Sequence, residues 1–576
     1  MKPILQSLQK TFFFFVVICG ISNKSYSQTP FTCPSLAFQV AGDTSLGPVS
    51  LYSYNINTGE RDLIAPLGRS VNAIAYNTVD NMIWGFDQNA FQMVRIDAAG
   101  VITAFPIPNL PPDIYNSADF LPNGYLLFYR TDSGTATLTY YVVDLDPNRA
   151  TYLQLVDPTQ AGFPLESAPY GTTMSQLTLT NDMAYNPTYN VLVGIGTGAN
   201  NKKIVTLNPT TGVVNVLPTA VSGDGFESTT GPYGAAFVDA GSNTSLYIFA
   251  NNPGSFYRID LANSKATLLS QSIIANNNDG ASCPTALLSI PISGNVFNDI
   301  SADNTVNGTG TNIGALNAVL YDNSTGKVVA VYPVNADGTY SFGATPGNDY
   351  SVYLTTNTPT VGQVAPPTPS LPAGYGNTGE NLGTATGNDG SAEGVLPLGV
   401  LTAPTTNANF GIKILVPFGC EALAYQVAGP DSRGPVSLFS YNINTGERVE
   451  ISALGRSINA IAYNPVDNMI WGFDQNSYQF VRIEADGSVT DFTIPNLPQD
   501  IYNSADFLPG GYLLFYRTDT GTATLTYYMI DLNPGRPATY LKLVDPTQVS
   551  YPLESAPYGT QMTQLTLTND MTYNAT

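Results

Sequence analysis

The stretch VNAIAYNTVDNMIWGFDQN at residues 71–89 contains the pattern that decides the fold of this chain. A run of small and apolar residues ends in a polar turn, and a second apolar run follows. Alternation with a period of two, interrupted by turn-forming Asn and Asp, is typical of two β-strands joined by a tight turn. We therefore expect a strand–turn–strand unit at this position.

The same pattern recurs through the first half of the chain, with a period of roughly 40–60 residues. Further copies are NSADFLPNGYLLFYRTDSG at 116–134, TNDMAYNPTYNVLVGIGTG at 180–198 and PYGAAFVDAGSNTSLYIFANN at 232–252. Alternating strands of a second kind lie between these copies, for example LYSYNINTGE at 51–60 and KIVTLNPTTG at 203–212. Together they predict four strands per repeat, which is the signature of β-propeller blades.

The number of strands favours a ring of five blades. SLAFQVAG at 35–42 is typical of the last strand of a blade, and NNDGASC at 277–283 of the strand before it. If these two segments pair, the ring closes and no sheet edge stays exposed. A ring of six or seven blades, or a pair of β-sandwiches, is the alternative. No segment has sustained helical periodicity.

Most of this unit is repeated in the last third of the chain. SLYSYNINTGER at 50–61 returns as SLFSYNINTGER at 437–448, and NMIWGFDQN at 81–89 returns unchanged at 468–476. The second copy reaches Thr576, which corresponds to Thr188 of the first. We therefore predict a complete unit at 28–285, a spacer at 286–413, and a second unit at 414–576 that is incomplete at its C-terminus.

The composition excludes several classes of function. Of the 576 residues, 43% are hydrophobic and only 11% are charged, with a formal net charge of −22. Binding to nucleic acid or to an anionic membrane needs a face of Lys and Arg, which so acidic a chain does not offer. The absence of histidine from the sequence excludes histidine-based nucleophilic triads, the usual zinc sites and imidazole acid–base catalysis.

Residues 1–27 have the pattern of a secretory signal peptide. Lysines near the start precede an apolar run at 11–21, and SYS at 25–27 is a small-residue cleavage site. The apolar run is much shorter than the ~20 residues that a membrane span needs. A lipoprotein signal through Cys19 is the alternative. We expect the mature chain to be secreted, or held at the cell surface, with no transmembrane segment.

Three cysteines follow the signal: Cys33, Cys283 and Cys420. An oxidising compartment favours pairing of such residues. Cys33 and Cys283 bracket the complete unit, and each precedes a proline, whereas Cys420 takes the Cys33 position in the second copy. We predict a Cys33–Cys283 disulfide that leaves Cys420 as the odd cysteine. Three free thiols are the alternative.

Three motifs of the unit carry a resemblance to a known family: YNINTGER at 54–61, AIAYN at 73–77 and WGFD at 84–87. The unit resembles a propeller-like domain of unassigned function found in secreted bacterial surface proteins, related to the WD40 and gluconolactonase-like propellers. The resemblance implies a β-propeller fold for both copies. It implies no activity.

The spacer has a different pattern, with GNVFND at 294–299, AVLYDNSTG at 318–326, DGTYSF at 337–342 and PGNDYSV at 346–352. This pattern resembles the Cna B-type or SdrD B-type immunoglobulin-like stalk repeat, which implies a β-sandwich over 286–413. No Lys–Asn pair with a catalytic Glu is recognisable, so we do not predict an isopeptide cross-link.

The spacer also contains a candidate calcium site. Asp299, Ser301 and Asp303 have the spacing of the first, third and fifth ligands of an oxygen-rich calcium loop. The resemblance adds that stalk repeats often bind calcium at this loop. Asn304 stands where a glycine usually follows, and a downstream acidic ligand is lacking. Bound calcium and a solvated turn are the two interpretations.

In a chain without histidine, carboxylates are the remaining candidate catalysts. Asp87, Asp119, Glu166 and Asp182 lie near predicted strand ends, where propeller loops converge on a central opening. Paired carboxylates about 5–9 Å apart can hydrolyse a glycoside. Side chains of this type also hydrogen-bond the backbone in turns, and we favour that structural role for them.

Aromatic residues supply candidate contact surfaces. Trp84 and Trp471 occupy matching positions, where the indole either stacks on a sugar or packs in the core. PPDIYNSADF at 111–120 and LESAPYGT at 165–172 combine Tyr with polar residues, which suits binding loops and ordinary packed loops alike.

These observations predict a secreted, all-β protein with a five-bladed propeller, an immunoglobulin-like spacer and a second, truncated propeller. We expect it to display binding surfaces for adhesion to extracellular polysaccharide or protein, without enzymatic activity. A carboxylate-dependent glycoside hydrolase or lyase is the alternative.

Overall fold

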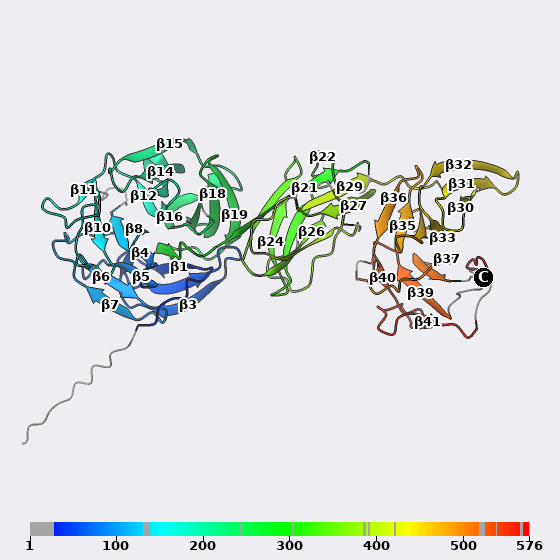
Figure 1. The fold of residues 1–576 in the computed structure, drawn as a ribbon, viewed down its shortest axis with the longest axis horizontal. Helices are drawn as coiled ribbons and strands as arrows, with labels where there is room; N and C mark the ends of the chain where they lie inside the picture. The colour runs from blue at the N-terminus through cyan, green and yellow to red at the C-terminus, as the bar shows by residue number, and fades with distance from the viewer. Residues whose placement is uncertain are drawn as a thin grey trace, which may run out of the picture.

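The computed structural model describes residues 28–130, 137–241, 244–301, 305–383, 387–389, 392–419, 422–517, 525–536, 538–564 and 568–574. The predicted signal peptide at 1–27 lies outside this range, as do Asp303 and Cys420. Within the described residues the protein is all-β, with two 3₁₀ turns, η1 (Gly198–Asn200) and η2 (Phe226–Ser228). No helix in this part of the chain is long and apolar enough to cross a membrane. Figure 1 shows three β-rich bodies that follow one another along the chain.

The first body contains five four-stranded antiparallel sheets among its described residues. Four of them follow chain order, with each strand paired to the next. They are β4 (Val71–Asn77), β5 (Met82–Asp87), β6 (Gln92–Ile96) and β7 (Ile102–Phe105); β8 (Ser117–Leu121), β9 (Tyr125–Tyr129), β10 (Thr139–Asp144) and β11 (Thr172–Thr173); β12 (Thr180–Asn186), β13 (Val191–Gly196), β14 (Lys203–Leu207) and β15 (Val214–Ala220); and β16 (Thr230–Phe237), β17 (Ser245–Asn252), β18 (Ser255–Asp260) and β19 (Lys265–Gln271).

The fifth sheet joins the two ends of this body. It contains β20 (Asn277–Ser282), β1 (Ala37–Gly42), β2 (Ser50–Tyr54) and β3 (Arg61–Pro66), in that order. β20 pairs antiparallel with β1, and Asp279 lies opposite Val40. A disulfide joins Cys33 to Cys283, with their Cα atoms 5.3 Å apart. Both the predicted pairing of the two terminal segments and the predicted disulfide are therefore confirmed.

The first strands of the sheets pack against one another in a closed cycle: β4 against β8, β8 against β12, β12 against β16, β16 against β20, and β20 against β4. A sheet in such a cycle has another sheet on each face. All six residues of β5, with the sequence MIWGFD, are consequently buried. This two-sided burial explains why the apolar runs of the sequence are nearly continuous in places, instead of strictly alternating.

The second body contains two sheets that enclose one hydrophobic core, whose members include Ile292, Leu320, Val352 and Phe410. The strands of the two sheets are β22 (Thr309–Gly310), β21 (Ile290–Asn298), β29 (Asn409–Ile414), β27 (Tyr375–Asn381) and β25 (Thr339–Ala344); and β24 (Lys327–Pro333), β23 (Asn317–Asp322), β26 (Asp349–Thr355) and β28 (Val395–Val400). β21 runs parallel to β29, and the other pairs are antiparallel.

The third body repeats the start of the first. Its strands are β30 (Ala424–Ala428), β31 (Ser437–Asn442) and β32 (Glu447–Ala453); β33 (Ile458–Asn464), β34 (Met469–Asp474), β35 (Gln479–Ile483) and β36 (Val489–Phe492); and β37 (Ser504–Leu508), β38 (Tyr512–Tyr516), β39 (Thr526–Asp531), β40 (Lys542–Leu543) and β41 (Thr560–Gln561). Among the described residues, β30 pairs with β31 alone, whereas its counterpart β1 also pairs with β20.

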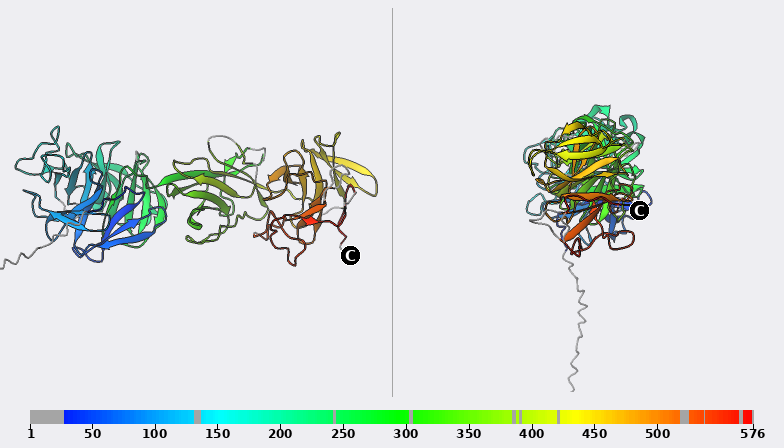
Figure 2. Two further views of the ribbon diagram at one scale, coloured as in Figure 1. Left: turned by 60° about the horizontal axis from the view of Figure 1, so that its bottom comes forward. Right: turned by 90° about the vertical axis from the view of Figure 1, so that its right-hand side faces the viewer.

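Specific contacts hold the second body to its neighbours, and all three bodies lie in a row in Figure 2. On one side, Asn57 Nδ2 donates to the Leu288 carbonyl (2.8 Å), and Tyr332 OH donates to Asp224 Oδ1 (3.0 Å). On the other side, Lys413 Nζ lies 3.0 Å from Glu484 Oε1, and both side chains are buried. The junctions are therefore packed contacts and not free linkers.

Candidate functional site

Three aspartates lie on first strands of the sheets in the first body. Asp182 and Asp279 are buried, and Asp119 is partly exposed. The carboxylate of each accepts a hydrogen bond from a backbone N–H of a neighbouring sheet. The donors are the N–H of Tyr185 to Asp119 (2.6 Å), that of Ala236 to Asp182 (2.7 Å) and that of Ile74 to Asp279. The carboxylates therefore link adjacent sheets of the cycle.

The surroundings of these three carboxyl groups raise their pKa values. Removal from water raises the pKa of Asp119 to about 7. Burial also raises the pKa of Asp182, and the nearby Asp279 raises it further. The pKa of Asp279 is raised as well, chiefly by burial. Asp279 was not among the sequence candidates, although its place in NNDGASC matches that of Asp182 in its own strand.

Of the other two candidate carboxylates, Asp87 ends β5 where a turn begins, and Glu166 lies in a loop. Asp87 forms an ion pair with Arg69 (2.9 Å) and accepts hydrogen bonds from the N–H groups of Asn89 and Ala90, both at 3.1 Å. Glu166 accepts a hydrogen bond from the N–H of Gly171 (2.8 Å), and burial raises its pKa. These contacts match the turn role that we favoured from the sequence.

Both tryptophans pack in the core. Trp84 is fully buried, its Nε1 donates to Asp80 Oδ2 (3.0 Å), and its ring lies 5.2 Å from that of Phe105. Trp471 is also fully buried, with a 2.9 Å hydrogen bond to Asp467. The core interpretation is confirmed, and sugar stacking on either indole is excluded by burial.

The candidate calcium loop is only partly within the described residues, because Asp303 lies outside them. Asp299 is buried, and its two carboxylate oxygens accept hydrogen bonds from Ser301 Oγ (3.0 Å) and Thr378 Oγ1 (2.7 Å). No group of three or more acidic, Cys or His side chains in the described part of the chain is arranged to hold a metal ion. Asp299 and Ser301 are hydrogen-bonded to each other, and because Asp303 lies outside the described residues, calcium binding at this loop stays a prediction.

Of the two candidate binding loops, the first is largely structural. Tyr115 is buried between Phe86 and Phe128, and its hydroxyl donates to the Pro111 carbonyl (2.9 Å). The interpretation of this loop as ordinary packing therefore holds for its tyrosine. In the second loop, Leu165 is exposed.

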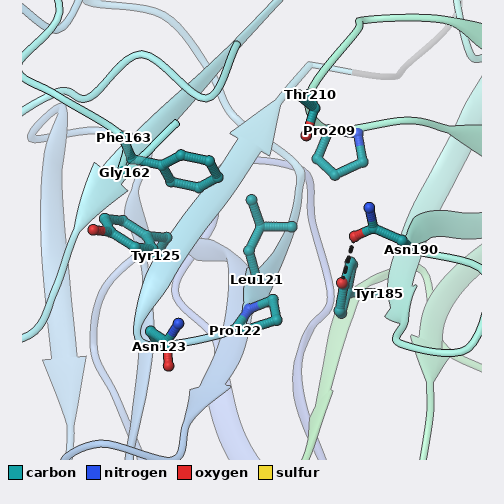
Figure 3. Close-up of a pocket in the computed structure, with 10 residues that line it drawn as sticks. All are labelled: Leu121, Pro122, Asn123, Tyr125, Gly162, Phe163, Tyr185, Asn190, Pro209 and Thr210. Atoms are coloured by element: carbon teal, nitrogen blue, oxygen red, sulfur yellow. Dashed lines mark hydrogen bonds between the residues drawn. The ribbon is translucent and has the colours of Figure 1, made fainter. Parts of the chain in front are cut away.

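A pocket of about 330 Å³ opens where the turn after β8 meets the turns after β12 and β14 (Figure 3). Tyr125 and Phe163 form one side, with ring centroids 4.6 Å apart. Tyr185 and Asn190 form the other side, where the Tyr185 hydroxyl donates to Asn190 Oδ1 (2.7 Å). The sequence analysis did not single out these residues. The signal for them was the Pro-Asn and Asn-Pro turns at equivalent positions of neighbouring repeats.

The pocket is uncharged. None of the ten described residues that line it is Asp, Glu, Lys or Arg. A cation beside the pocket, Arg149, stacks on the Tyr125 ring at 4.2 Å and pairs with Asp144 at 2.6 Å. Its charge is therefore neutralised, and the stack holds the tyrosine ring in place.

A family model described as "Repeat of unknown function (DUF6923)" matches residues 38–285 and 425–573. The chain belongs to this family. The two matched regions coincide with the two copies, and the family description assigns no activity. No curated protein matches the chain.

Solved structures with some similarity include a chain of a nidogen–laminin complex, with 12% identity and a TM-score of 0.27, covering 43% of this chain and 99% of that one. A protein of unknown function from Bacteroides caccae has 12% identity and a TM-score of 0.24, covering 40% and 72%. Virginiamycin B lyase from Staphylococcus aureus has 10% identity and a TM-score of 0.22, covering 83% and 94%. Likeness at these scores carries no argument about this DUF6923 chain.

Proposed function

We propose that the five sheets of the first body are the blades of a five-bladed propeller and that the sheets of the third body are blades of the same kind. The closed cycle of first strands and the pairing of β20 with β1 support this assignment. The second body would then be an immunoglobulin-like spacer of the Cna B or SdrD B type. Its two sheets around a single core support that part of the proposal.

We propose that this protein is exported and displays its propeller surfaces for adhesion to extracellular polysaccharide or protein. The observation that carries the proposal is the packed spacer: ion pairs and hydrogen bonds hold the two repeated bodies apart on either side of it. Such an arrangement presents surfaces at a set distance. The Cys33–Cys283 disulfide supports an oxidising, extracellular location.

A carboxylate-dependent hydrolase or lyase is the weaker candidate. A glycosidase needs two carboxyl groups that flank the substrate bond, one to donate a proton and one to attack or activate water. Asp182 and Asp279 are buried, and each bonds a neighbouring backbone N–H. Asp87 is held by Arg69 and by its own turn. The two partly exposed candidates also accept backbone hydrogen bonds: Asp119 from the N–H of Tyr185 and Glu166 from that of Gly171.

One experiment separates the two functions. The intact protein is incubated with immobilised polysaccharides and extracellular proteins, and both retention and the release of reducing ends are measured. Retention without turnover supports adhesion. If the protein turns over a polysaccharide and this activity disappears in Asp119→Asn or Asp87→Asn, the adhesion proposal is wrong and the protein is a carboxylate-dependent enzyme. If no polysaccharide or protein is retained, the adhesion proposal fails.

A further inference from the structure

We infer that the pocket between Phe163 and Asn190 binds a neutral sugar unit of an extracellular glycan. This inference rests on the proposed adhesive function and assigns it to one site. It begins with the shape of the pocket: its volume of about 330 Å³ is at the small end of the range for ligand sites, ~300–1,000 Å³. Such a volume suits one short segment of a glycan, and not a folded protein surface.

The two sides of the pocket have different chemistry. Phe163 is partly exposed beside the Tyr125 ring, and Figure 3 shows it on the opposite side of Leu121 from Asn190. The face of an aromatic ring carries partial negative charge, which attracts the C–H groups on the apolar face of a sugar. The pocket therefore has an apolar platform on one side only.

Asn190 supplies the polar side. Its Oδ1 accepts the hydrogen bond from Tyr185, which fixes the orientation of the amide. The Nδ2 group, with two N–H donors, is then directed away from Tyr185, toward Pro209 and Thr210 (Figure 3). A fixed donor pair opposite an aromatic face suits a ligand that has hydroxyl acceptors along one edge and C–H groups on its face.

Charge and topology narrow the ligand class. With an uncharged lining and a formal net charge of −22 on the whole chain, the site does not attract sulfated or uronic polymers. Peptides are commonly bound by strand addition at a sheet edge, by charged clusters or, when they are rich in proline, in aromatic-lined grooves. This pocket lies at strand ends and turns, its lining carries no charge, and its aromatic pair forms one side only. A neutral saccharide is the class that fits both observations.

The second copy contains a natural control. Tyr512 and Tyr551 repeat the aromatic pair, with centroids 4.7 Å apart, and Arg536 repeats the cation stack at 4.0 Å. The two copies therefore share the aromatic platform. Among the described residues, the polar side formed by Tyr185 and Asn190 is present in the first copy.

The test uses the intact protein and an array of neutral glucans, mannans, galactans and xylans, with sulfated and sialylated glycans for comparison. Phe163→Ala removes the platform, and Asn190→Asp keeps the acceptor for Tyr185 but removes both N–H donors. Each change should weaken binding of the best-retained neutral glycan about tenfold or more. Phe163→Tyr and the matched Tyr551→Ala should stay within about twofold of the unmodified protein. Thermal melting of every variant shows that it is folded.

The failures of the two proposals are distinguishable. If glycans are retained equally by the protein and by Phe163→Ala, the pocket assignment is wrong while the adhesive function stands. The assignment is also wrong if only charged glycans bind, or if only proteins bind and Phe163→Ala abolishes their binding. If nothing is retained by any variant, both proposals fail.

Discussion

Ile56 and Ile443 occupy the same position of the repeated stretch YNINTGE, yet Ile56 is 1% exposed and Ile443 is 77% exposed. In the first copy the turn packs against β19, where Ser270 Oγ donates to the Ile56 carbonyl and Ser272 Oγ to the Gly59 carbonyl, both at 2.7 Å. The described part of the second copy has no counterpart of β19. Identical local sequence therefore has opposite burial.

Truncation of these two isoleucines should consequently differ in effect. Ile56→Ala removes a buried side chain and should lower the stability of the first body by about 2–4 kcal/mol, since such changes leave a cavity. Ile443→Ala should change the stability of its body by less than about 0.5 kcal/mol, as expected of exposed positions. Calorimetric melting of both variants measures the difference. Equal shifts would contradict the packing of the YNINTGE turn.

The adjacent glycine provides a second matched pair. Gly59 and Gly446 both have positive φ, at 74° and 76°, so alanine strains either backbone by about 1 kcal/mol. A Cβ on Gly59 would also lie 2.0 Å from the Gln271 carbonyl oxygen, whereas one on Gly446 would meet no atom within 4 Å. Gly59→Ala should therefore lower the melting temperature clearly more than Gly446→Ala. The reverse order would show that β19 does not approach this turn.

Loss of the disulfide should destabilise the sheet in which β20 pairs with β1. The Cys33–Cys283 bond closes a loop with a sequence separation of 250, and removal of a native disulfide typically costs about 2–5 kcal/mol. The double variant Cys33→Ser, Cys283→Ser should melt at a lower temperature, and reductant should have no further effect on its first body. If reductant lowers the melting temperature of variant and unmodified protein equally, another thiol is responsible.

Asp119 should make the first body less stable as the pH rises. Its folded-state pKa of about 7 lies above the unfolded value of about 3.9. The folded state therefore binds more protons between these values, and the contribution of Asp119 to stability is full below about pH 4 and is lost as the pH rises through about 7. Asp119→Asn removes this titration. The difference in unfolding free energy between variant and unmodified protein should change across this window, and a constant difference would refute the prediction.

The Lys413–Glu484 ion pair should stabilise the contact between the spacer and the third body. Glu484 Oε2 also accepts a hydrogen bond from the N–H of Val416 (2.9 Å). Lys413→Met leaves Glu484 buried without this cation, which typically costs about 3–5 kcal/mol. Lys413→Met combined with Glu484→Gln should recover part of that loss, because residue 484 then carries no charge, although the buried Arg482, whose guanidinium lies 3.9 Å from Glu484, loses its carboxylate partner. The rate of protease cleavage at the junction measures how stable this contact is in each variant. A double variant that is cleaved faster than the single variant would contradict the prediction.

Local patterns in the sequence were sufficient for the strands and their turns. Strand alternation and Asn- or Gly-containing turns act over a few residues, so they predicted the β4–β5 pair and the pairing of NNDGASC with SLAFQVAG, both confirmed. The core role favoured for Trp84 and the turn role favoured for Asp87 also agree with the structure. Most of these depend on near neighbours in the chain, whereas the pairing of NNDGASC at 277–283 with SLAFQVAG at 35–42 followed from the number of strands.

The candidate site could not be predicted from local sequence patterns. The pocket brings Tyr125 of β9 and Phe163 of the loop between β10 and β11 together with Asn190 of the neighbouring sheet, and no periodicity in the sequence relates those three positions. Asp279 was missed for the same reason, because its importance depends on the N–H of Ile74, about 200 residues away along the chain. The candidate calcium ligands at 299 and 301 lie within the described residues and Asp303 lies outside them, so that site stays a prediction.

The sequence by itself determined the all-β class, the duplication and the identity of the two cysteines that pair, because each is encoded in local alternation or in direct repetition. Only the tertiary structure decided which copy of a repeated residue is buried, which carboxylates link neighbouring sheets, and where a pocket opens. Those properties depend on the elements that surround a residue, and identical segments differ in them when their neighbours differ.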